Sequence, residues 1–170
     1  GNTFENVNFA GPLHATAGGQ ADYHTVIVGA EETYFKNCVF GADSATRAAG
    51  SIINFLGSTT PRCIFDNCLF YMNASANAAF FISCDAGLGE GFAVFNNCKF
   101  INTGTTLTVG IDGTGLNNFQ ILLDATTTMY GCTDVVAAAY ESKVISGVGT
   151  SATPDEDISW HLALPVDHTA

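Results

Sequence analysis

Acidic residues near expected turns are the side chains of this chain whose type and spacing best fit catalysis. A glycosidase needs two carboxylates that face each other across a groove, roughly 5 to 9.5 Å apart. Asp85 and Asp112 follow equivalent apolar segments in successive repeats, which places them within reach of one another. The other candidate acids at turns and corners are Asp22, Asp43, Asp66, Glu90 and Asp124. Because acidic residues are also common turn formers, the sequence favours a turn role for the pair over catalysis.

Other catalytic and metal-binding patterns are missing from the sequence. It contains no GxSxG, P-loop or HExxH motif, and no CxxC or zinc-spaced Cys/His cluster. The four His residues are scattered, and Arg47 and Arg62 have no DxD-type acidic cluster nearby. The sequence therefore predicts a protein that is not an enzyme and that uses no metal or cofactor.

The charge and hydropathy of the chain bear on its partners. Its 170 residues have a net charge of −11, and only 12% of them are charged. The five permanent cations are Lys36, Arg47, Arg62, Lys99 and Lys143. An acidic surface repels phosphate backbones, and no apolar run approaches the roughly 20 residues that span a membrane. We therefore expect neither nucleic acid nor a membrane as a partner.

A six-residue phrase recurs about every thirty residues along the chain. Its four clear copies are centred on Asn6, Asn37, Asn67 and Asn97, with spacings of 31, 30 and 30 residues. A looser fifth copy, residues 122–127, has Asp124 in place of the Asn and Ala125 in place of a Cys. Self-similarity at a fixed period is the signature of a solenoid.

The residue types within the phrase have different structural roles. The Phe residues are expected to form two aromatic stacks in the core, Phe4, Phe35, Phe65 and Phe95 in one and Phe9, Phe40, Phe70 and Phe100 in the other. Asn tolerates left-handed backbone angles that turn the chain sharply, and its amide can bond the Asn of the next coil in a ladder. Core packing, not catalysis, is expected at all of these positions.

The cysteines follow the same repeat. Three of the six, Cys38, Cys68 and Cys98, recur at one position of the phrase, which is typical of a packing position. We expect their side chains to point inward as small hydrophobic groups. The sequence therefore predicts buried free thiols in preference to a disulfide framework or a metal site.

Two-residue alternation of apolar side chains in and around the phrase indicates strands. Second strands are expected between the phrases, at residues 25–28, 51–55, 79–82, 107–109 and 143–145. Residues 135–141 fit either a short helix or a turn. Units of one length whose strands keep one order stack as parallel sheets about 4.8 Å apart. The predicted fold is thus an all-β parallel β-helix of about five coils of about 30 residues, spanning residues 1–149.

Residues 150–170 form an irregular tail of different composition. Two prolines and an acidic run argue against another coil, and an apolar stretch provides candidate partner contacts at Trp160, Leu162 and Leu164. The tail either covers the open end of its own solenoid or inserts into a neighbouring subunit. At the other end the chain begins at Gly1, already inside a repeat, so we expect a capping or attaching segment to precede it.

The phrases at residues 35–40 and 95–102, the Ala- and Thr-rich second strands and the segment 122–134 resemble a group of bacteriophage virion proteins. These are head proteins with a pectin-lyase-like, right-handed parallel β-helix, encoded near the major capsid protein. The resemblance covers roughly residues 1–150. It implies a decoration or cement role, in which trimers bind the major capsid protein at the capsid surface and carry no catalytic residues.

A tailspike or fibre-type β-helix, which binds or degrades host polysaccharide, is the alternative. Such a protein needs a longer helix and an aromatic, acidic groove. Most aromatic residues here fall inside the repeat, and the few expected outside it are Tyr23, Tyr71, Tyr130 and Tyr140.

Overall fold

A computed structural model describes residues 1–10, 24–29 and 31–146 of the chain. The candidate contacts Trp160, Leu162 and Leu164, with the rest of the tail, lie outside the described residues, as do Asp22 and Tyr23. Strands make up 61% of the structure, and they stack as a parallel β-solenoid of about four turns whose coils are about 29 residues apart. The predicted all-β parallel solenoid is therefore confirmed.

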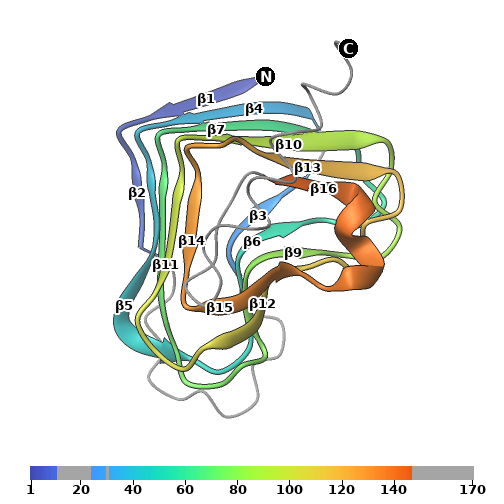
Figure 1. Cartoon of the computed structure of the whole chain (residues 1–170). Helices are drawn as coiled ribbons and strands as arrows, with labels where there is room; N and C mark the ends of the chain where they lie inside the picture. The colour runs from blue at the N-terminus through green and yellow to red at the C-terminus, as the bar shows by residue number, and fades with distance from the viewer. Residues whose placement is uncertain (11–23, 30, 147–170) are drawn as a thin grey trace.

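Three parallel sheets enclose the core, each built from one strand per coil (Figure 1). Sheet A contains β1 (Asn2–Glu5), β4 (Glu31–Lys36), β7 (Pro61–Asp66), β10 (Gly91–Asn96), β13 (Phe119–Leu123) and β16 (Val144–Ser146). Sheet B contains β2 (Asn8–Phe9), β5 (Val39–Arg47), β8 (Leu69–Ala74), β11 (Lys99–Asn102) and β14 (Thr128–Tyr130). Sheet C contains β3 (His24–Val28), β6 (Gly50–Phe55), β9 (Ala79–Cys84), β12 (Leu107–Asp112) and β15 (Cys132–Val136).

The last coil differs from the sequence prediction. The strand expected at residues 143–145 exists as β16, but it pairs with β13 in sheet A and not with the second strands. The fifth strand of sheet C is β15, which pairs with β12. Residues 138–143 form a 3₁₀ helix (η1), so of the two alternatives left open at 135–141, a short helix or a turn, the helix occurs and lies slightly later. Alternation identifies a strand but does not say which sheet it joins, and this explains the error.

The Phe side chains form the predicted stacks in the core. Phe35 and Phe65 stack with ring centroids 4.8 Å apart, and Phe65 and Phe95 with centroids 4.6 Å apart. The second stack includes Phe40, Phe70 and Phe100, with centroid distances of 4.8 and 4.4 Å. The two stacks meet edge to face, as between Phe65 and Phe70. All six of these rings are buried, so the stacks fix the register of sheets A and B together.

Asn residues turn the chain between sheets A and B. Asn37, Asn67 and Asn97 have φ angles of 52°, 53° and 49°, in the left-handed region that few side chains tolerate. The Asn67 amide donates to the Asn37 side-chain oxygen at 2.8 Å, and the Asn97 amide donates to that of Asn67 at 3.1 Å. Asn6 shares the positive φ, at 56°. The corner residues thus form a ladder along the outside of the stack.

The fifth copy of the phrase has a different register from the one that the sequence suggested. Phe95 pairs with Leu123 and not with Leu122, and Phe100 pairs with Met129 and not with Thr127. The fifth corner therefore contains one residue more than the corners before it. Asp124 is the first residue of this corner. Thr127 is the residue of this coil that lies beside Cys98, and its hydroxyl accepts a hydrogen bond from the Cys98 backbone N–H at 3.1 Å.

Substitution of Asn67 tests the corner. Asn67→Ala is expected to lower the free energy of unfolding by about 2 kcal/mol, because Ala is strained in the left-handed region and makes no ladder bond. Asn67→Gly keeps the backbone angle and loses the ladder bonds, so a loss on the order of 1 kcal/mol is expected. Urea denaturation measures both values. Equal losses for the two variants would show that the backbone angle does not matter.

Candidate functional site

The candidate acids Asp85 and Asp112 lie at the ends of the neighbouring strands β9 and β12 and bond the backbone of the turns beside them. Asp112 pairs in register with Ser83, two positions before Asp85. The Asp85 carboxylate accepts a long hydrogen bond from the Gly57 N–H at 3.4 Å, and the Asp112 carboxylate accepts one from the Thr114 N–H at 3.1 Å. Both side chains are half-buried and support the turns beside them. Neither residue lines either of the two grooves described below.

Asp66 lies where the sequence placed it, in register with Lys36 on one side and Asn96 on the other. Its carboxylate accepts a hydrogen bond from the Tyr34 hydroxyl at 3.0 Å. This hydrogen bond raises the pKa of Tyr34, with smaller contributions from desolvation and from the charge of Asp66. Asp66 is thus part of the outer surface of sheet A. The side chain of Asp43 lies outside the described residues.

Asp124 ends the ladder of corner residues. Its carboxylate accepts hydrogen bonds from the Thr127 N–H at 2.8 Å and from the Thr126 hydroxyl at 2.7 Å. It also accepts the Asn97 N–H at 3.1 Å. At earlier corners the equivalent Asn N–H donates to a backbone carbonyl instead, as the Asn67 N–H does to the Asn96 carbonyl. Partial burial raises the pKa of Asp124, but the hydrogen bonds outweigh it and hold the pKa below its ordinary value.

The cysteines are free thiols, and all six are buried. The Cys68 thiol lies 3.6 Å from the Phe35 carbonyl, and the Cys98 thiol lies 3.5 Å from the Phe65 carbonyl, one coil below in each case. Burial raises the pKa of Cys63 to about 12 and that of Cys132 to about 12. The Cys63 and Cys132 thiols therefore stay protonated at neutral pH. All six cysteines pack as part of the core.

The outer face of sheet A carries a regular pattern of side chains in rows. Strand alternation sends every second side chain of this sheet outward, and the parallel register aligns these side chains in rows. The apolar row runs across five strands and consists of Tyr34, Ile64, Val94, Leu122 and Ile145. Ile64 and Ile145 are exposed by 38% and 49%, which is high for large apolar side chains.

Two polar rows flank the apolar row. The first flanking row contains Glu32, Arg62, Phe92 and Gln120, and Lys143 continues it just before β16. The second flanking row contains Glu5, Lys36, Asp66 and Asn96. Within the second row Lys36 lies 3.5 Å from Glu5 as an exposed ion pair. The face therefore combines apolar and oppositely charged side chains.

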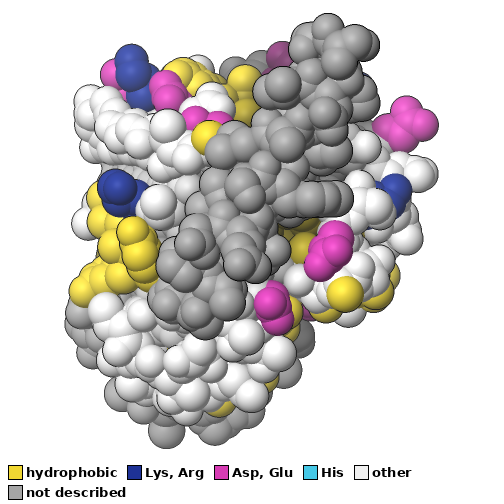
Figure 2. All heavy atoms as spheres, viewed as in Figure 1, with side chains coloured by type: hydrophobic (Ala, Val, Ile, Leu, Met, Phe, Trp, Pro, Cys, Tyr) yellow, Lys and Arg dark blue, Asp and Glu magenta, His cyan; other side chains and the backbone are white. Residues whose placement is uncertain are grey.

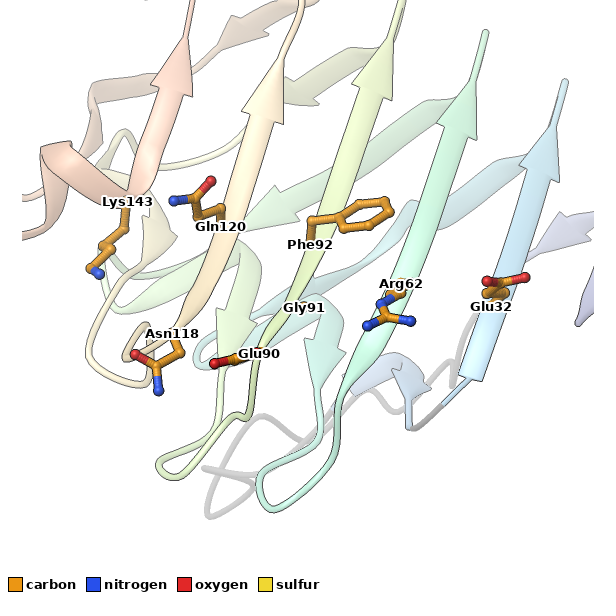
Figure 3. Close-up of a pocket in the computed structure, with 8 residues that line it drawn as sticks. All are labelled: Glu32, Arg62, Glu90, Gly91, Phe92, Asn118, Gln120 and Lys143. Atoms are coloured by element: carbon orange, nitrogen blue, oxygen red, sulfur yellow. The ribbon is translucent and has the colours of Figure 1, made fainter.

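Two shallow grooves lie along the first flanking row. One, of about 690 Å³, is lined by charged and amide side chains around Phe92, including Glu90, Asn118 and Lys143 (Figure 3). The other, of about 440 Å³, extends toward the N-terminus between the first flanking row and the apolar row and is lined by Tyr34 and Ile64 among others. Both grooves share Glu32, Arg62 and Phe92. Seen along the stack, charged and apolar side chains lie next to one another at the upper left edge of the molecule, where sheet A lies (Figures 1 and 2).

Phe92 is the residue of this site that the sequence analysis missed. It lies three positions before Phe95, so strand alternation places it outside when Phe95 is inside. Its exposed fraction is 36%. Of the tyrosines expected outside, Tyr130 is exposed, whereas Tyr71 and Tyr140 are half-buried.

The fold defines the class of the protein as a parallel β-solenoid. Comparison with family models, curated proteins and solved structures finds no match to the chain. Among the described residues no helix is long and apolar enough to cross a membrane. The described part of the chain also contains no group of three or more His, Cys, Asp or Glu side chains arranged to hold a metal ion.

Acid unfolding tests the Asp124 corner. The folded-state pKa of Asp124 is lowered, so its ionised form stabilises the fold above the ordinary value of about 3.9, and this contribution is lost as the pH falls through the folded-state value. Asp124→Asn is expected to lower stability at pH 6 and to reduce the difference in stability between pH 6 and pH 3. Exposed Glu141 provides a control as Glu141→Gln. An equal effect of both variants would contradict the assignment.

Thiol accessibility tests the core. In the folded chain at pH 8, the six cysteines are expected to react with a chromogenic disulfide reagent at least about 100-fold more slowly than in the urea-unfolded chain, because burial hinders access to their sulfur atoms. The absorbance change measures the rate. Rapid reaction of Cys63 or Cys132 in the folded protein, identified by mass spectrometry, would contradict their burial.

Proposed function

We propose that this chain is a structural virion protein, most simply a decoration or cement protein that binds the major capsid protein on the outer surface of a phage head. The observation that carries the proposal is that three candidate catalytic acids form hydrogen bonds within the scaffold. Asp124 organises a corner, and Asp85 and Asp112 support turns. Such use is typical of a protein whose task is to be rigid and to present a surface.

The outer face of sheet A supports the same proposal. Its apolar row is straight and in register over β4, β7, β10, β13 and β16. An exposed apolar row with a polar border has the composition of a protein interface, which has an apolar centre and a polar rim. A cement protein needs such a surface to hold its neighbours.

Glycan binding is a second candidate function, and the groove around Phe92 favours it. An exposed aromatic ring with carboxylates, amides and cations around it offers both stacking and hydrogen bonding to a sugar (Figure 3). The volume of about 690 Å³ lies in the range of small-molecule sites. The groove is open, however, which suits a flat partner as well.

Location in the particle tests the structural role. Antibody labelling of intact particles of the phage that encodes the chain is expected to mark the head, because the proposed partner is the major capsid protein. Electron microscopy gives the measurement, with particles that lack the protein as a control. Labelling confined to the tail would overturn the capsid proposal.

An activity assay tests the non-enzymatic role. We expect no release of reducing ends when the chain is incubated with host surface polysaccharide, because Asp85 and Asp112 are used by turns. Asp85→Asn and Asp112→Asn are the matched variants. Depolymerisation that either substitution abolishes would establish an enzyme in place of a structural protein.

A further inference from the structure

The outer face of sheet A carries charges of both signs in nearly equal number. Three of the five Lys and Arg residues, Lys36, Arg62 and Lys143, lie on this face or at its edge. The acids on it are Glu5, Glu32, Asp66 and Glu90, so the face is close to neutral. The whole chain, by contrast, has a net charge of −11. Two copies of the chain that meet through this face therefore bring together nearly balanced charges, although each whole chain is strongly acidic.

The two flanking rows carry opposite charges at the same level of the stack. On β4, Glu32 lies in the first flanking row and Lys36 in the second. On β7 the signs are reversed, because Arg62 lies in the first row and Asp66 in the second. A two-fold rotation about an axis along the apolar row exchanges the two rows and keeps each strand at its own level.

We infer that a second copy of this chain docks on the outer face of sheet A, with the two solenoid axes parallel and the two-fold axis along the apolar row. Glu32 then lies opposite Lys36 of the second copy, and Arg62 lies opposite Asp66 of the second copy. Each pair occurs twice, as an isologous interface requires. Ile64 lies near the axis and meets Ile64 of the second copy.

The size of the face sets the strength of the contact. Six strands about 4.8 Å apart, with three to six residues in each strand, give a patch of about 24 by 17 Å. The buried surface is then roughly 800 Å² in total, which is the size of a weak or transient contact. We therefore expect a dimer that dissociates in the micromolar range. This inference does not depend on the virion role. Dimerisation is measured on the free chain, whereas the virion role is tested by labelling intact particles, so either can fail without the other.

Sedimentation velocity over a range from about 1 to 200 µM tests the docking. The full chain is expected to shift from monomer to dimer, and Ile64→Lys is expected to weaken dimerisation at least about tenfold. The control is Ile27→Lys, since Ile27 is exposed by 57% but lies on β3 of sheet C. Circular dichroism checks that both variants fold. A monomer at all concentrations, a trimer, or an equal effect of both substitutions would overturn the inference.

Charge reversal and cross-linking test the parallel arrangement. Arg62→Asp is expected to weaken the dimer, and the double variant Arg62→Asp with Asp66→Arg is expected to restore it, because both opposed pairs are then reversed. Under mild oxidation Ile64→Cys is expected to form a disulfide between copies, whereas Ile27→Cys is not. Because the native thiols are buried, they do not compete. A dimer with no rescue and no disulfide at Ile64→Cys would overturn this geometry.

Discussion

The structure depends on one backbone constraint, which is the left-handed residue at the corner between sheets A and B. With φ near 50° at Asn37, Asn67 and Asn97, a single residue turns the chain so that the Phe before it and the Phe after it both point inward. Those Phe rings stack on their equivalents in the next coil, and this stacking sets the register of both sheets. Asn fits because its amide also bonds along the ladder.

The same register determines the outer surface. Once Phe65 is fixed inside, alternation places Ile64 and Arg62 outside. Parallel pairing without a shift then places Ile64 beside Tyr34 and Val94. The corner therefore determines where the outward side chains of this row lie, but it does not determine which residue types they are. A polar residue at position 64 or 145 would leave the core unchanged, so the exposed Ile side chains at these positions favour a role for the row in binding.

The sequence was sufficient to predict the solenoid, the Phe stacks and the Asn corners, because the phrase repeats at a fixed spacing in four copies. It was not sufficient where the phrase decays. The fifth corner has an extra residue, and Leu122 and Leu123 are equally plausible equivalents of Phe95 until the pairing is known. The sequence placed Asp85 and Asp112 after equivalent strands of successive coils, but it did not give their register, in which Asp112 lies beside Ser83, two positions before Asp85. Phe92 was overlooked, although it lies three positions before the inward-pointing Phe95, so strand alternation turns its side chain outward.

A solenoid also restricts the kind of site that it can form. Neighbours in space are equivalents in the repeat, so side chains gather as rows along the stack and not as converging groups from distant segments. Inside, the rows consist of like residues, because each coil meets the same packing requirement. In the first flanking row the residue changes at every coil, from Glu32 to Arg62, Phe92 and Gln120. Packing does not require this variety, and it suits the proposed contact with a second copy, in which Glu32 and Arg62 each meet a side chain of opposite charge from the other flanking row.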